Sequence, residues 1–216
     1  MIEEPANRNQ LSEEPGRTLQ EVEGETFFDG VSLEKIANEV GTPTYIYSAK
    51  SFNKQFQELE NAFKRVDSKI FYSVKANSNV NIISLFNQLD SGFDIVSGGE
   101  LHRVIAAGAD PQAIIFSGVG KSVSEIDLAL KVGIDCFNVE SAPELDRIIE
   151  RSRVLGKKPD ISVRINPDID ALTHPYISTG LKENKFGVDR VSACLLYTSD
   201  AADEGLGVDL GGRRII

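Results

Sequence analysis

Short apolar runs alternate with helical patterns over most of the chain. Runs typical of β-strands lie at 69–76, 92–97, 113–118, 136–140 and 161–167. Helical spacing of apolar residues follows each of the first four runs, at 79–90, 98–108, 122–133 and 141–156. This alternation predicts an α/β fold with a parallel sheet and right-handed crossovers. The apolar segment 113–116 lacks alternation, which is typical of a strand covered on both faces.

Three more elements are predicted before residue 69. The segment 31–41 has helical spacing, with Ser32 as its N-cap and Gly41 as its stop. The run Tyr45–Tyr47 is expected to form a strand. A second helix is expected over 48–66, where apolar residues recur at helical spacing.

The strand-like runs contain or end in polar residues. These are Lys75 with Asn77, Asp94 with Ser97, Ser117, Glu140, and Arg164 with Asn166. A doubly wound sheet and a (β/α)8 barrel both fit the alternation, but no G-x-G-x-x-G follows the first run, which disfavours the dinucleotide-binding version of the former. In a barrel these strand ends meet at one rim, where catalytic groups gather. We therefore predict a partial (β/α)8 barrel of the TIM type, with five of its eight units present.

Local composition divides the chain into three parts. Residues 1–26 carry seven glutamates against two arginines, which predicts a disordered acidic tail. Residues 27–193 hold the predicted barrel elements. Residues 194–216 continue no βα pattern and resemble a translated sequencing adapter, so we expect a non-native tail there. Its glycine-rich stretch follows no predicted strand and is not expected to bind phosphate.

Charge and cysteine content narrow the class of protein. The net charge of −10 disfavours a nucleic-acid partner. Two cysteines form no disulfide framework and fit a reducing compartment, and Cys136 lies in an apolar run as a small buried residue would. No signal peptide or membrane-spanning run is found, so we expect a cytoplasmic protein without a membrane partner. No metal site is expected.

Lys75 is the leading candidate for chemistry. A lysine at a strand end beside apolar neighbours is expected to be partly desolvated, which lowers the pKa of an amine and makes it nucleophilic. Such an amine forms Schiff bases with carbonyl compounds or with pyridoxal phosphate (PLP). The alternative is an ordinary solvent-facing lysine.

Four segments carry a family resemblance. "YSVKAN" around Lys75 resembles the cofactor-lysine motif of the fold-type III PLP decarboxylases. "FDIVSGGELHRVIAAG", "IIFSGVGKSVSEIDLAL" and "VRINPDIDALTHPYISTGLKENKFGVD" are similar, in the same order, to segments of the diaminopimelate decarboxylase branch. The resemblance covers about residues 27–192 and implies an alanine-racemase-like PLP barrel.

The resemblance implies a reaction and a cofactor. A diaminopimelate decarboxylase removes CO2 from meso-diaminopimelate to give L-lysine, with PLP delocalising the resulting carbanion. The alternatives are a decarboxylase of the same fold acting on ornithine, arginine or another basic amino acid, a non-catalytic PLP-binding homologue, and a Schiff-base aldolase that needs no PLP.

The resemblance also implies site residues. Lys75 is expected to bind PLP and to act as an acid or base once displaced. Asp94 is expected to help hold Lys75, Arg164 to meet the phenolic oxygen of the ring, and Asn77 and Ser97 to contribute to cofactor binding. His174, in the loop after the fifth strand, is expected to shape the site, and Lys185 to lie near a dimer contact. For Asp94, Arg164 and Asn77 a local structural role, such as an ion pair or a helix cap, stays open.

The expected partners are a small amino-acid substrate and, for the full-length protein, a second copy in a homodimer. The family's later phosphate loop and other site segments find no counterpart in the sequence, so we expect the chain as written to be inactive. Its five parallel strands would leave unpaired edges, which predicts aggregation or a molten state.

Overall fold

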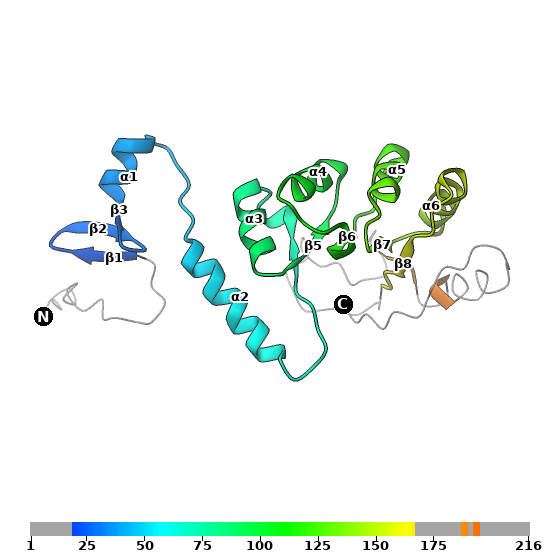
Figure 1. The fold of residues 1–216 in the computed structure, drawn as a ribbon, viewed down its shortest axis with the longest axis horizontal. Coiled ribbons are helices and arrows are strands. Elements are labelled where there is room, and N and C mark those ends of the chain that lie inside the picture. Colours follow the sequence, from blue (N-terminus) through cyan, green and yellow to red (C-terminus); the bar gives the residue numbers. More distant parts are fainter. Residues whose placement is uncertain (1–18, 167–186, 190–191, 195–216) are drawn as a thin grey trace, which may run out of the picture. The chain divides into compact units, whose positions relative to one another are not determined.

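The computed structural model describes residues 19–166, 187–189 and 192–194 (Figure 1). The chain divides into two compact units, Met1–Ser68 and Lys69–Ile216, which are described separately below.

The first unit begins with a small antiparallel sheet. Strands β1 (Leu19–Val22), β2 (Glu25–Phe28) and β3 (Val31–Ser32) pair in the order β1-β2-β3. Glu23 and Gly24 join β1 to β2 with φ angles of 53° and 83°, and two positive φ values are what a type I′ hairpin turn requires. Within the described residues, the last part of the acidic segment for which we expected disorder, 19–26, forms a strand and the start of its partner, because the turn lets these short β-forming runs pair.

Two helices follow, close to their predicted positions. Helix α1 (Leu33–Val40) is capped by Ser32, whose hydroxyl accepts the Lys35 backbone N–H at 3.2 Å, and it ends at Gly41. Helix α2 (Ala49–Phe63) is capped in the same way by Ser48. The predicted strand at Tyr45–Tyr47 was wrong: the segment is not part of either sheet, and Tyr45 is 90% exposed. β-propensity does not make a strand without a neighbouring strand to share hydrogen bonds.

The second unit is built on a five-stranded parallel sheet. Its strands are β4 (Phe71–Ser73), β5 (Gly92–Ile95), β6 (Ile114–Phe116), β7 (Cys136–Val139) and β8 (Asp160–Val163). They lie in sequence order, each hydrogen-bonded to the next. The prediction of a parallel sheet made from consecutive βα units is confirmed.

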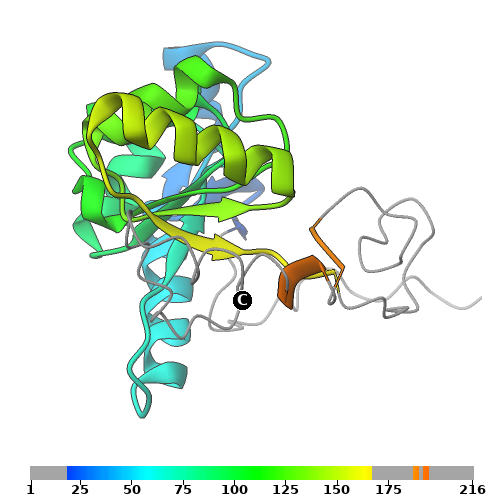
Figure 2. The same cartoon turned by 90° about the vertical axis from the view of Figure 1, so that its right-hand side faces the viewer.

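Helices connect the strands along one face of this sheet. They are α3 (Val80–Gln88), α4 (Gly98–Ala106), α5 (Val123–Val132) and α6 (Ala142–Leu155), with short 3-10 turns η1 (Val74–Ala76) and η2 (Pro111–Ala113). Both ribbon views show α3 to α6 as a row on the same side (Figure 1 and Figure 2). Right-handed crossovers produce such a row when the strands follow one another in order.

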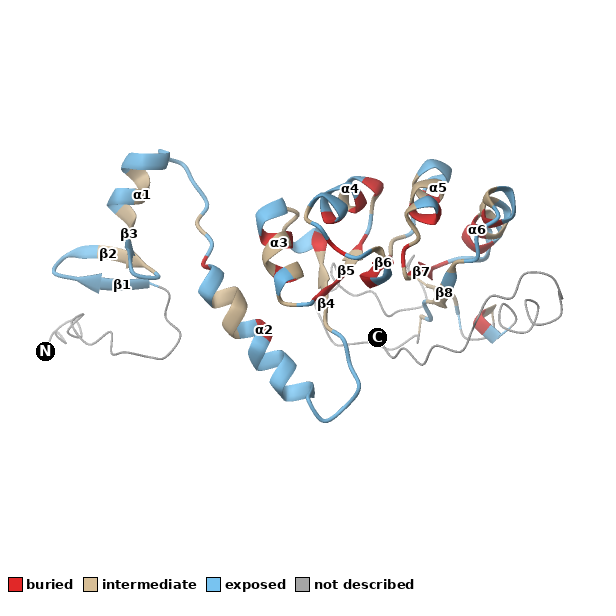
Figure 3. Cartoon of the chain, in the orientation of Figure 1, coloured by how far each residue is buried: buried red, intermediate tan, exposed pale blue. Residues whose placement is uncertain are grey.

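The core lies between the sheet and its helices (Figure 3). Phe93, Ile95, Phe116, Phe137 and Val139 on the strands have no exposed surface. Asp94 lies between Phe93 and Ile95, and Asn138 lies between Phe137 and Val139, so these two polar side chains are on the other face of the sheet. No helix in the described residues is long and apolar enough to span a membrane.

Candidate active site

The carboxyl ends of the five strands define one edge of the sheet. Because β4 to β8 are parallel, the residues that follow each strand share this edge. Lys75 follows the first strand and Arg164 follows the last. The polar strand ends picked out in the sequence therefore belong to a common rim, as the barrel interpretation requires.

Lys75 lies beyond its strand rather than in it. Strand β4 ends at Ser73, and Val74 and Lys75 form the 3-10 turn η1. Val74 is fully buried and anchors the turn, whereas Lys75 is exposed. The partial desolvation expected for Lys75 is therefore not present in the described part of the chain, because the chain leaves the apolar sheet one residue before the lysine.

The turn around Lys75 is braced from both sides. The Tyr72 hydroxyl donates to the Asn77 carbonyl at 3.0 Å, and the Tyr72 ring stacks on Phe86 with centroids 4.1 Å apart. The Asn77 side chain accepts the Asn79 backbone N–H at 3.0 Å. Asn79, not Asn77, is the N-cap of α3. Asn77 thus shapes the backbone immediately after Lys75 through a local Asx-type turn.

Asp94 is the centre of a hydrogen-bonded row across four strands. Its carboxylate accepts from the Ser117 hydroxyl at 2.5 Å and from the Ser73 hydroxyl at 3.4 Å. The Asn138 amide donates to the Ser117 hydroxyl at 2.8 Å. These are the hydrogen bonds of Asp94 in the described residues, and none of them involves Lys75. The expected Asp94–Lys75 contact is therefore replaced by a row of side chains that ties β4, β5, β6 and β7 together.

Ser97 begins helix α4. Its hydroxyl accepts the Glu100 backbone N–H at 3.2 Å, which satisfies one of the free donors at the helix start. The next residue, Gly98, donates its backbone N–H to Glu125 at 2.7 Å. A β-carbon at Gly98 would lie 2.9 Å from the Glu125 side chain, so a larger residue there would force that side chain to shift.

Glu125 holds the starts of two helices together. One carboxylate oxygen accepts from Gly98 of α4, and the other closes a capping box with Ser122 at the start of α5. The Gly98 N–H and then the Ser122 N–H and hydroxyl lower the pKa of Glu125, since each stabilises the carboxylate. This carboxylate is a structural clamp behind the rim.

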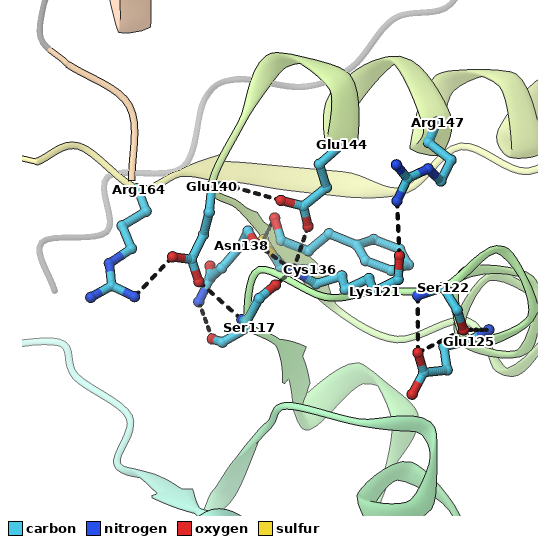
Figure 4. A network of polar contacts seen from close by, with 12 residues as sticks. Ser117, Lys121, Ser122, Glu125, Cys136, Asn138, Glu140, Glu144, Arg147 and Arg164 are labelled. Atoms are coloured by element: carbon cyan, nitrogen blue, oxygen red, sulfur yellow. Dashed lines mark hydrogen bonds and ion pairs between the residues drawn. The ribbon is translucent and has the colours of Figure 1, made fainter. Parts of the chain in front are cut away.

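Arg164 follows β8 and pairs with Glu140. Its guanidinium Nη1 donates to Glu140 Oε2 at 3.0 Å, and the other oxygen of Glu140 accepts the Gly118 backbone N–H at 3.0 Å (Figure 4). The Arg164 backbone is held by hydrogen bonds to Val139 and Val188. The side chain of Arg164 is 44% exposed, whereas that of Glu140 is 1% exposed.

A second ion pair, between the buried side chains of Lys121 and Glu144, adjoins the Glu140 backbone. Lys121 Nζ donates to Glu144 Oε1 at 2.6 Å and to the carbonyls of Gly118 and Asn138 at 2.8 Å each. The three acceptors match the three donors of an ammonium group. The other oxygen of Glu144 accepts the Glu140 backbone N–H at 2.8 Å (Figure 4).

Sequence reasoning did not assign this network to the site. Ser117 and Glu140 were visible as polar ends of apolar runs, and Lys121 lies in a segment of the family resemblance. Nothing in the sequence indicated a role for Glu144, because a glutamate in the first turn of a helix is common. His174 and Lys185 lie outside the described residues.

Comparison with known proteins identifies the family. Residues 49–211 match the pyridoxal-dependent decarboxylase family in its pyridoxal binding domain. The chain is 52% identical over 171 residues to the diaminopimelate decarboxylase of Neisseria meningitidis serogroup B, a match that covers 79% of this chain and 41% of that protein.

Solved structures agree with this assignment. The diaminopimelate decarboxylase of Helicobacter pylori in complex with L-lysine has a TM-score of 0.76 at 48% identity, over 80% of this chain and 44% of the other. The enzyme of M. jannaschii in co-complex with L-lysine has a TM-score of 0.78 at 36% identity, over 89% and 46%. The chain thus spans less than half the length of these relatives, and it belongs to the pyridoxal-dependent decarboxylase family through its pyridoxal binding domain.

Proposed function

We propose that the protein containing this chain is a PLP-dependent carboxy-lyase that converts meso-diaminopimelate to L-lysine. The observation that carries the proposal is the placement of Lys75 and Arg164 after parallel strands of a pyridoxal-binding domain, on one edge of the sheet. Relatives at 45–52% identity are diaminopimelate decarboxylases, which favours this substrate.

The residues at this edge suit the cofactor. Lys75 offers an exposed primary amine, which is the group that links covalently to the PLP aldehyde. Arg164 offers a permanent positive charge for an anionic ring oxygen. The row Ser73–Asp94–Ser117–Asn138 supplies neutral and acidic hydrogen-bonding groups on the face of the sheet away from the helices. When bound, PLP supplies an electron sink for the carbanion left by decarboxylation.

The chain's own residues then have distinct tasks. Lys75 binds the cofactor and afterwards moves a proton at its amine. Tyr72 and Asn77 fix the turn that presents Lys75. Ser97 fixes the start of α4, and Asp94 fixes the spacing of the neighbouring strands. Within this proposal His174 contributes to the substrate side of the rim.

A decarboxylase for ornithine, arginine or another basic amino acid is the second candidate. The chain resembles the solved arginine decarboxylase of Paramecium bursaria Chlorella virus at 24% identity with a TM-score of 0.65, which supports a shared fold alone. A non-catalytic PLP-binding homologue is disfavoured because Lys75 is present.

The domain limits, assembly and location are part of the proposal. We take 27–193 as barrel-domain sequence, with 1–26 and 194–216 outside it, although the family match runs on to residue 211. A homodimer and a cytoplasmic location fit a biosynthetic enzyme with two free cysteines.

The test uses the protein expressed from its complete gene. PLP is added, the bound cofactor is fixed by borohydride reduction, and the labelled peptide is found by mass spectrometry. We expect the label on Lys75 and none after Lys75→Ala. The matched control is Lys69→Ala, which removes a nearby lysine that pairs with Asp90 at 3.8 Å and should keep the label.

Substrate choice is tested with the same protein. Release of CO2 is measured with meso-diaminopimelate, ornithine, arginine and lysine in parallel. We expect turnover to be greatest with meso-diaminopimelate. A label on another lysine would refute the assigned role of Lys75, and a preference for a different amino acid would refute the substrate alone.

A further inference from the structure

We infer that Glu140 is a positioning residue that holds the Arg164 guanidinium at the rim, with the buried Lys121–Glu144 pair as its anchor. This inference rests on the proposed function, in which Arg164 faces the cofactor. Glu140 itself is not placed in contact with the cofactor.

The first support is the burial of Glu140. Its side chain is 1% exposed, and each of its two oxygens has a partner, one the Gly118 N–H and the other the Arg164 guanidinium. A buried carboxylate is costly unless it is paired and hydrogen-bonded. Arg164, whose side chain is 44% exposed, is therefore held by a carboxylate that is itself buried.

The second support is the way in which Glu140 is held. Its backbone N–H donates to Glu144, and Glu144 binds Lys121. Lys121 in turn holds the carbonyl of Gly118, in the segment after β6, and that of Asn138, in β7. The Arg147 guanidinium also donates to the Lys121 carbonyl at 3.0 Å. Figure 4 shows this chain of contacts leading from α6 to Arg164.

The third support is that the backbone of Arg164 is fixed as well. Its N–H donates to Val139 and its carbonyl accepts from Val188. Gly187 approaches so closely that a β-carbon there would lie 2.9 Å from the Arg164 carbonyl oxygen. With both the backbone and one guanidinium nitrogen fixed, the long side chain loses most of its freedom before any ligand arrives, which lowers the entropy cost of binding.

The experiment compares Glu140→Gln with Glu125→Gln in the protein from the complete gene. Both replaced carboxylates accept the backbone N–H of a glycine, but in the described structure only Glu140 also binds a guanidinium. The first readout needs no cofactor: an arginine-specific dicarbonyl reagent labels the apo protein, and mass spectrometry follows each peptide. Arg151, which pairs with Asp127 at 2.7 Å, is the internal reference.

We expect Arg164 to be labelled several-fold faster in Glu140→Gln, with Arg151 unchanged, and no acceleration at Arg164 in Glu125→Gln. The reason is that loss of the carboxylate removes the contact that holds the guanidinium and leaves it easier for the reagent to reach. Should Glu140→Gln fail to fold, Glu140→Asp keeps the charge while withdrawing it by one methylene, and it should still accelerate labelling at Arg164. An unchanged rate at Arg164 overturns the inference.

The second readout is PLP affinity in a double-mutant cycle. Glu140→Gln and Arg164→Gln should each weaken PLP binding about tenfold, equivalent to about 1.4 kcal/mol. The double variant should bind no more weakly than Arg164→Gln, because Glu140 acts through Arg164. Additive losses overturn the inference. Failure of the parent protein to bind PLP overturns the proposed function instead, and the labelling result then reports on the ion pair by itself.

Discussion

The ammonium nitrogen of Lys121 lies 2.6 Å from a carboxylate oxygen of Glu144, and the two side chains are 0% and 4% exposed. The pair joins the segment after β6 to the first turn of α6. Lys121 also lies 5.4 Å from the centre of the Phe116 ring. A charge pair so deeply buried fixes geometry more than it adds net stability, and it becomes costly when one partner is removed.

Removal of one partner should therefore destabilise the protein strongly. Lys121→Met leaves the Glu144 charge buried without its cation, and we expect the free energy of unfolding to fall by about 3–5 kcal/mol. Urea denaturation measures the change. Lys35→Met is the control, because its 3.9 Å pair with Glu39 is exposed on α1 and should contribute less than about 1 kcal/mol. Similar losses of unfolding free energy in the two variants would contradict the expectation that the buried pair is the more costly one to break.

Glu125 should make stability depend on acid pH. Its folded pKa lies below the ordinary value of 4.5, so the carboxylate stabilises the fold above that value, and the contribution is lost as the pH falls through the folded pKa. Glu125→Gln should therefore cost about 1 kcal/mol at neutral pH, a modest figure because the group is only partly buried. The difference from the parent should shrink toward low pH. Melting temperatures across the pH range check this, and a constant difference would argue against it.

Gly187 should be intolerant of a side chain. Its φ is 80°, and a β-carbon would press on the Arg164 carbonyl and on the Asn166 N–H. We expect Gly187→Ala to lower the free energy of unfolding by about 1–3 kcal/mol and to weaken PLP binding by shifting Arg164. Gly120→Ala is the control, since nothing lies within 4 Å of a β-carbon there. Denaturation and PLP titration of both variants measure these two effects. Equal unfolding free energies and PLP affinities in the two variants would refute the prediction.

Loss of the Ser117 hydroxyl should destabilise the protein more than the small size of this side chain suggests. This hydroxyl donates to Asp94 and accepts from Asn138, a residue that is 8% exposed. Ser117→Ala leaves the Asn138 amide without this acceptor, at an expected cost of about 1–3 kcal/mol in unfolding free energy. Ser68→Ala removes a hydroxyl with one exposed 3.4 Å hydrogen bond and should be nearly neutral by the same denaturation assay. A neutral Ser117→Ala would show that the row across the strands is dispensable.

Much of the second unit could be predicted from local pattern. Residues such as Ile82, Ile83 and Phe86 recur at helical spacing, and they are buried on α3. The runs at β5 and β7 are short and apolar because these strands pack under helices. The start of α1 could be predicted at Ser32, because a serine side chain caps backbone N–H groups only two or three residues further along the chain.

Prediction failed where a partner in space was needed. Tyr45–Tyr47 has β-forming residues but does not pair with another strand. Leu19–Val22 is a strand because the tight turn after it brings the following residues back to pair with it. The sequence placed Lys75 at the end of a strand, but the ladder with β5 stops at Ser73, and the lysine is exposed.

The amino-acid sequence by itself determined the order of strands and helices, the parallel sheet and the candidate residues Lys75, Asp94 and Arg164, because apolar spacing and caps act over a few neighbouring residues. Only the tertiary structure decided which polar groups meet. Glu140 and Arg164 are 24 residues apart, and so are Asp127 and Arg151. Such contacts depend on the register of adjacent strands and on how two helices pack, and no local pattern in the chain specifies these.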